Sequence, residues 1–99
     1  MSDIEARLTA LRHRFLVRLG ADRRLLQSEA GDLRAREPML RIVHRIAGLA
    51  GSVGLPALGQ AAQACEAAVI AQPAAALADT PEFRSLLEAT DEALERCGC

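Results

Sequence analysis

Residues 40–55 read LRIVHRIAGLAGSVGL, a segment that places a single histidine among residues with little or no side chain. With about 100° of rotation per residue, the large apolar residues here and just before it cluster on one side of a helix: Met39, Ile42, Ile46, Leu49 and Val53. That side is expected to face a core. His44 lies on the opposite side, with Ala47 and Gly48 one turn on. The segment therefore predicts a helix that displays a histidine to solvent on a surface open to a close-approaching partner.

The residues around His44 indicate which chemistry the surface could support. Arg45 lies about 100° from His44 on the helical wheel, and six residues lie within roughly 60°: Glu37, Leu40, Arg41, Ala47, Gly48 and Gly51. Glycine within a helix costs about 1 kcal/mol relative to alanine, so Gly48 and Gly51 are better explained by the approach of a partner than by packing. His44 is a titratable nucleophile, and guanidinium groups beside it can balance the charge of a phosphoryl group.

The neighbouring segments are helical in pattern, and prolines mark where the helices begin and end. The helix of His44 is expected from about Pro38 to Ser52. Pro56 is then well placed to open a third helix that ends near Ala71, before Pro73.

The first and fourth helices are predicted from their N-terminal sequences. Ser2 and Glu5 fit a capping box at the start of a long first helix that ends near Gly31, and Thr80 before Pro81 is expected to cap the fourth helix. Apolar residues recur at helical spacing in both segments. The predicted inward positions are Ile4, Leu8, Leu11, Phe15, Leu19, Leu26 and Leu33 in the first helix and Phe83, Leu86, Leu87 and Leu94 in the fourth.

The composition favours helices around one core. Hydrophobic residues make up 51 % of the 99 residues, mostly as alanine and leucine, and Phe15 and Phe83 are the only aromatic residues. A sheet would need more β-branched and aromatic residues, and a chain of this length supports a single core. Four helices joined by short links form an antiparallel bundle most economically. We therefore expect an all-α, antiparallel four-helix bundle.

The charge is unevenly distributed, although the net charge is only −1. Residues 1–50 carry a formal charge of +4 and residues 51–99 a formal charge of −5, and the chain has no lysine. Such blocks form either complementary solvated faces of one bundle or a basic docking face for an acidic partner. Both interpretations stay open at this point.

The chain is expected to be cytoplasmic. No apolar run approaches the roughly 20 residues that a membrane span requires, and the N-terminal segment carries acidic residues instead of the basic residues of a signal peptide. The three cysteines, Cys65, Cys97 and Cys99, do not form a disulfide framework. We expect reduced thiols, with Cys65 as a small core residue, and a surface position for His13.

The segment IVHRIAGLAGSVGL, residues 42–55, resembles the signature of histidine-containing phosphotransfer (HPt) domains of bacterial two-component phosphorelays. That signature is H-x-x-K-G followed by small residues and a glycine turn. The resemblance rests on His44, Gly48, the AGSVGL stretch 50–55 and the ACE triplet 64–66 on the next helix, and the whole chain, residues 1–99, fits one HPt-like domain. The motif lysine is Ala47 here, as in the H-x-x-A-G form of the family.

The resemblance implies a phosphocarrier whose His44 accepts a phosphoryl group from a receiver-domain aspartate and passes it to another receiver. Glu66 matches the position at which family members hold the other imidazole nitrogen with an acidic or amide side chain. Gly48 would let the aspartyl phosphate approach with its metal, because the catalytic acids and the metal belong to the receiver. With the motif lysine absent, positive charge near the phosphoryl group comes from Arg41, from Arg45, from the partner or from no residue, and Arg41 is favoured because it lies nearer to His44 on the helical face.

The implied partners are response-regulator receiver domains and a hybrid sensor kinase, bound by a monomer that is a phosphotransfer intermediate and not an enzyme. No cofactor, metal, nucleic acid or membrane is expected to bind. A helix-turn-helix DNA binder is excluded by charge, because no basic residue between Arg45 and Arg84 could neutralise phosphates. A metal site from the histidine and the cysteines fails because the terminal C-G-C lacks the usual two-residue spacer. A helical interaction module that carries no phosphate stays open as the alternative.

Overall fold

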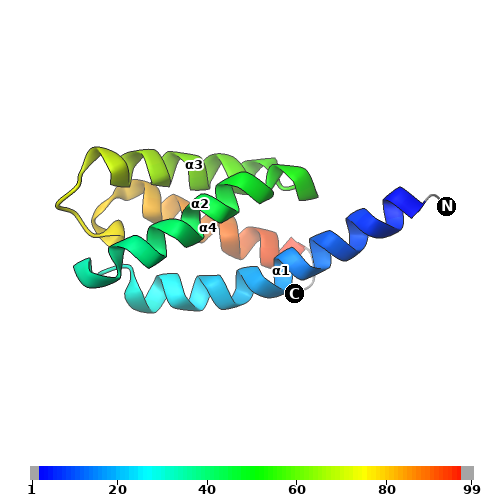
Figure 1. Cartoon of the computed structure of the whole chain (residues 1–99), viewed down its shortest axis with the longest axis horizontal. Helices are drawn as coiled ribbons and strands as arrows, with labels where there is room; N and C mark the ends of the chain where they lie inside the picture. Colours follow the sequence, from blue (N-terminus) through cyan, green and yellow to red (C-terminus); the bar gives the residue numbers. More distant parts are fainter. Residues whose placement is uncertain (1–2, 97–99) are drawn as a thin grey trace.

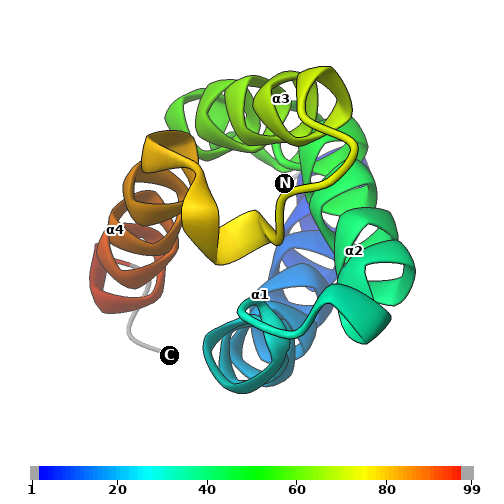
Figure 2. The ribbon, with the colours of Figure 1, turned by 90° about the vertical axis from the view of Figure 1, so that its left-hand side faces the viewer.

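The computed structural model describes residues 3–96 and contains four α-helices connected through short 3₁₀ turns. The elements are α1 (Asp3–Glu29), η1 (Leu33–Ala35), α2 (Arg36–Leu49), η2 (Gly51–Val53), α3 (Pro56–Ala71), η3 (Leu77–Asp79) and α4 (Pro81–Arg96). Consecutive helices run antiparallel (Figure 1). Seen end-on, α3 packs between α2 and α4, and α1 contacts both α2 and α4 (Figure 2). The predicted all-α, antiparallel four-helix bundle is confirmed.

The link between α2 and α3 is tighter than the sequence suggested. The α2 helix ends at Leu49 and not near Ser52, because the chain continues as the 3₁₀ helix η2. It then turns at Gly54, whose φ is 83°. This left-handed conformation favours glycine. A Cβ at Gly54 would also lie 2.7 Å from Nη2 of Arg12, whose Nε donates a hydrogen bond of 2.8 Å to the Val53 carbonyl. Glycine is therefore required at this turn, which brings α3 back along α2.

The core contains side chains from all four helices. Its fully buried members include Leu19, Leu26, Val43, Ile46, Cys65, Val69, Leu77 and Leu86. On α2 the predicted core side is confirmed for Ile42 and Ile46 but is wrong for Leu49, which is 46 % exposed. The predicted core position of Cys65 is confirmed, and burial raises the pKa of its thiol to about 11. The neutral thiol is therefore kept away from solvent.

The N-terminal part of α1 extends beyond the bundle (Figure 1). Residues 3–14, which we call the overhang, are all exposed. The predicted inward positions are therefore wrong for Ile4, Leu8 and Leu11, which are 67 %, 44 % and 48 % exposed, and also for Leu33. The stripe has helical spacing throughout, but α2, α3 and α4 are too short to cover all of it. Ser2 of the predicted capping box lies outside the described residues.

Two ion pairs fix the inner part of α1 to its neighbours. The buried carboxylate of Asp22 pairs with Arg45 of α2. Arg23 donates to both carboxylate oxygens of Asp91 on α4, over 2.5 and 3.0 Å, and these hydrogen bonds lower the pKa of Asp91. Successive residues of α1 thus hold two different helices, which sets the rotation of α1 and α2 about their axes.

Thr80 directly precedes α4, as predicted, but its hydroxyl bonds to the turn before it and not to α4. Its hydroxyl is buried and donates to the Leu77 carbonyl over 2.8 Å, which stabilises η3. Its own carbonyl accepts from the amide of Phe83 over 3.2 Å. The amide of Ala78 donates to the Ala30 carbonyl over 3.1 Å, so this loop also closes the end of the bundle near α1.

Candidate functional site

His44 lies on the outward face of α2, and its side chain is 76 % exposed. Its Nδ1 lies 2.5 Å from Oε2 of Glu66, whose side chain on α3 is only 23 % exposed. The two residues are 22 positions apart in the chain and meet because α2 and α3 pack side by side (Figure 2). The structure therefore brings together the histidine and the carboxylate that the resemblance had paired.

The contact with Glu66 determines the tautomer of His44. A carboxylate can only accept a hydrogen bond, so the proton of the imidazole must be on Nδ1. The lone pair is then on Nε2, the nitrogen that Glu66 does not contact. The half-buried carboxylate also limits rotation of the exposed ring. In the neutral ring, the arrangement therefore presents the lone pair of Nε2 on an exposed and oriented imidazole.

The surface beside His44 is open because two glycines border it. Beyond its chain neighbours and the backbone of its own helix, a Cβ on Gly48 of α2 or on Gly51 of η2 would meet no atom within 4 Å. Gly59 of α3, which the sequence analysis missed, has a different environment, since its Cβ would lie 3.5 Å from the Cβ of Ala50 and 3.6 Å from the amide nitrogen of Gly51. These are ordinary van der Waals distances, so Gly59 faces the contact between α3 and α2, while Gly48 and Gly51 face open space.

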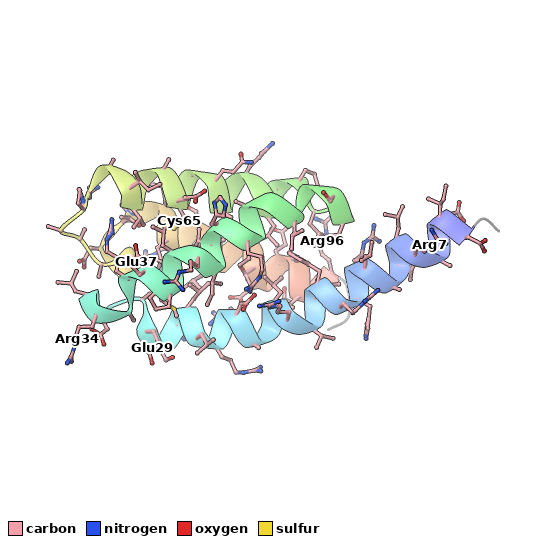
Figure 3. All side chains as sticks on the ribbon, in the orientation of Figure 1. Arg7, Glu29, Arg34, Glu37, Cys65 and Arg96 are labelled. Atoms are coloured by element: carbon pink, nitrogen blue, oxygen red, sulfur yellow. The ribbon has the colours of Figure 1, made fainter. Side chains whose placement is uncertain are left out.

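Two arginines near His44 have different environments. Arg41 is exposed, lies 3.6 Å from Glu37 at the preceding turn, and shares a shallow cavity of about 230 Å³ with His44 and Glu66. Figure 3 shows Glu37 on the same helix. Arg45 instead pairs with Asp22 on the side of α2 that faces α1. Arg41 is thus the guanidinium that lies beside the histidine.

Asp22 is a residue that the sequence analysis missed. It occupies a position between Leu19 and Leu26 on the inward stripe of α1, where an apolar residue is the usual choice. A buried carboxylate on such a stripe needs a cationic partner. The arginines close to His44 in the sequence were candidates for that partner, so the position of Asp22 was a signal that the sequence contained.

The remaining candidates lie outside this cluster. Ala47 is half-buried and packs against the core, one turn from His44 towards α3. His13 is exposed on the overhang, as predicted. Cys65 is buried on α3 (Figure 3), whereas Cys97 and Cys99 lie outside the described residues. Within residues 3–96, no three histidine, cysteine or acidic side chains are grouped as metal ligands would be.

A four-helix bundle with an outward histidine on its second helix, oriented by a carboxylate from the third helix and bordered by bare glycine surface, has the construction of a histidine phosphotransfer domain. The chain belongs to the Hpt domain family, whose model matches residues 3–96. No curated protein and no solved structure gives a significant match. Hpt domains are phosphocarriers of phosphorelays, and histidine phosphotransfer is therefore the class of function to which the chain belongs. None of the described helices is long and apolar enough to span a bilayer.

Proposed function

We propose that the protein carries a phosphoryl group on Nε2 of His44, taken from the aspartate of one receiver domain and given to the aspartate of another. The hydrogen bond between Nδ1 of His44 and Glu66 is the observation that carries this proposal, because in the neutral imidazole it assigns the proton to Nδ1 and the lone pair to Nε2 on an exposed ring. A hybrid sensor kinase is a natural source of the first receiver.

The transfer needs little covalent machinery from this chain. The lone pair of Nε2 attacks the phosphorus in line, the bond from phosphorus to the aspartyl oxygen breaks, and the aspartate leaves as a carboxylate. The ring gains a positive charge, which the carboxylate of Glu66 at 2.5 Å from Nδ1 stabilises. Transfer to the second receiver reverses these bond changes, and Nδ1 keeps its proton throughout.

The surface around His44 supports close approach and charge balance. Gly48 and Gly51 leave room for the rim of a receiver active site, so that the acyl phosphate reaches Nε2 without a side chain in its path. Arg41, in the shallow cavity beside the ring, is placed to balance phosphoryl oxygens once its weak contact with Glu37 opens. The catalytic acids and the metal ion come from the receiver.

The direct test is to incubate the chain with a receiver domain that carries labelled aspartyl phosphate. We expect label on the chain that is lost in acid and kept in base, as for a phosphoramidate, and that passes to a second, unphosphorylated receiver. Binding of the receiver without transfer of label would instead support a helical interaction module. Base-labile label on the chain would place the phosphoryl group on a carboxylate and would contradict the proposal.

A further inference from the structure

The apolar stripe of α1 is covered along only part of its length. In the bundle, Leu19 and Leu26 on this stripe are 1 % and 0 % exposed. The same face of the helix continues through the overhang, where Ile4, Leu8 and Leu11 are 44–67 % exposed. Residues 3–96 supply nothing to cover them. The overhang is thus an amphipathic segment whose apolar face lacks a packing partner within the described chain.

A cavity lies at the corner between α1 and the end of α2, where the exposed part of the stripe meets the bundle. This cavity has a volume of about 290 Å³ and apolar walls formed by Leu11, Phe15, Leu49 and Val53. The exposure of Leu49 at 46 %, unexpected for a core-side residue of α2, is explained by its position in this wall. The corner is concave, because the overhang forms one side and the α2–η2 end of the bundle forms the other (Figure 1).

One edge of the stripe is strongly basic. Arg7, Arg14 and Arg18 fall within about 40° of one another on the helical wheel, directly beside the apolar residues. In the described part of the chain, none of the three forms an ion pair, and Arg14 and Arg18 also line the cavity. Arg12, on the other edge, is engaged with the Val53 carbonyl. Figure 3 shows Arg7 on the overhang, beyond the end of the bundle.

We propose that the overhang and the corner cavity form a docking surface for an acidic amphipathic α-helix of a partner protein. Apolar residues of that helix bury the stripe and fill the cavity, and its carboxylates pair with Arg7, Arg14 and Arg18. Residues 3–14 span about 18 Å, enough for three to four turns of a helix. Arg45 and Leu49 line this corner roughly 100° to 140° around α2 from His44, so the surface is separate from the phosphotransfer site.

The charge pattern and the shape decide between this occupant and two others. Two overhangs paired antiparallel about a twofold axis would bring arginine edge against arginine edge, which is repulsive. An anionic bilayer attracts basic amphipathic helices, but its surface is flat and cannot enter a concave corner. A helix with acidic residues on one edge satisfies both the charge and the shape.

The test uses two helix-stapled peptides about 14 residues long, with leucines at i, i+3, i+4 and i+7. One carries glutamates along one edge of the leucine face and the other carries lysines at the same positions. Fluorescence anisotropy with the full chain should show saturable binding of the glutamate peptide and at least about tenfold weaker binding of the lysine peptide. Equal binding of both peptides, or no saturable binding of the glutamate peptide, would overturn the proposal.

Variants of the chain locate the surface. Leu11→Asp and the pair Arg14→Glu with Arg18→Glu should each weaken binding of the glutamate peptide at least about tenfold. Matched changes on the far side of α1, Val17→Asp at a residue 61 % exposed and Arg24→Glu, should leave it unchanged. Circular dichroism checks that all variants stay helical. Loss of binding in the far-side variants would contradict the assignment.

Two further measurements test the competing occupants. Sedimentation of the parent chain should show no dimer that Leu11→Asp abolishes, and anionic phosphatidylserine vesicles should not bind the chain through the overhang. A dimer that Leu11→Asp abolishes, or binding of the chain to the vesicles through the overhang, would overturn the proposal. The His44→Gln variant should bind the peptide like the parent, so failure of docking and failure of phosphotransfer are distinguishable.

Discussion

The chain has two exposed histidines in arginine-rich sequence, and they differ in what surrounds them in space. His13 on the overhang follows Arg12 and precedes Arg14, and among residues 3–96 it has no hydrogen-bond or ion-pair partner. His44 on α2 also precedes an arginine, but its Nδ1 contacts Glu66 of α3 at 2.5 Å. Exposure and neighbouring arginines are common to both and therefore cannot define the site.

The difference lies in the second helix. Only a histidine on a helix segment that packs against other helices can contact a half-buried carboxylate of a neighbouring helix. For His44 on α2, that carboxylate is Glu66 of α3. The overhang has no such neighbour, so no side chain among residues 3–96 holds the ring of His13 in one orientation. Gly48 of α2 and Gly51 of η2 add a bare surface beside His44. Orientation, tautomer and access are thus properties of the bundle and not of the histidine.

The largest expected effect separates the two histidines directly. His44→Gln should abolish acid-labile labelling by a phosphorylated receiver, because the nucleophilic nitrogen is removed, while His13→Gln should label like the parent. Both residues are exposed, so neither change should alter the helical content measured by circular dichroism. Persistent label on His44→Gln would show that another residue accepts the phosphoryl group.

The next effect tests the bare surface. Gly48→Leu should slow transfer about 100-fold, because its side chain would displace the acyl phosphate from the in-line position. The same variant should be about 0.8 kcal/mol more stable to unfolding, since leucine is the better helix former and a Cβ there meets nothing. Gly20→Leu on α1, where a Cβ also meets nothing, is the control. It should raise stability similarly and leave the rate of transfer unchanged. A parental rate for Gly48→Leu would mean that no receiver approaches over this residue.

Loss of the Glu66 carboxylate is expected to slow transfer less than blocking the surface at Gly48 does. Glu66→Ala should reduce the rate of transfer about tenfold, because the loss of a charge-assisted hydrogen bond of about 1.5 kcal/mol releases the ring and its tautomer. Glu66→Gln retains an oxygen acceptor and should stay closer to the parent. Single-turnover kinetics with one receiver would distinguish them. If Glu66→Ala transferred at the parental rate, the contrast between His44 and His13 would have to arise from the glycines alone.

The sequence predicted the bundle well because its helices carry strong local signals. Pro56 and Pro81 begin α3 and α4, and the spacing of Ile42 and Ile46 identified the buried side of α2. These signals depend on contacts within one segment. The outward direction of His44 follows from the same periodicity, so half of the site was accessible without coordinates.

What failed depended on the lengths and contacts of other helices. The periodicity of α1 could not show that Leu8 and Leu11 extend beyond the other helices, because a stripe has the same spacing whether or not it is covered. The environment of Arg45 was likewise unpredictable, since Asp22 meets it only after α1 and α2 have packed. Glu66 was accessible solely through family resemblance, because no spacing rule links residues on different helices.

A smaller effect concerns the two arginines that flank His44. Arg41→Ala should slow transfer at most about fivefold, the kinetic equivalent of the roughly 1 kcal/mol of an exposed charge interaction, with stability unchanged. Arg45→Ala should leave transfer by the folded protein nearly unchanged but lower the free energy of unfolding by roughly 2 kcal/mol, because Asp22 stays buried without its partner. Urea denaturation and transfer kinetics on both variants check this. Reversed effects would exchange the assigned roles of Arg41 and Arg45.

The smallest effect tests whether Arg41 replaces the motif lysine. Ala47→Lys places an ammonium one turn from His44, and because position 47 is half-buried, the stem can lie along the apolar surface while the charge reaches solvent. We expect transfer to become two- to threefold faster or phosphohistidine to last correspondingly longer, since an exposed charge contributes about 0.5 kcal/mol. In the Arg41→Ala background the same substitution should recover part or all of the lost rate, because either cation then balances the same phosphoryl oxygens. If Arg41→Ala and the double variant both transfer like the parent, the receiver alone supplies the positive charge.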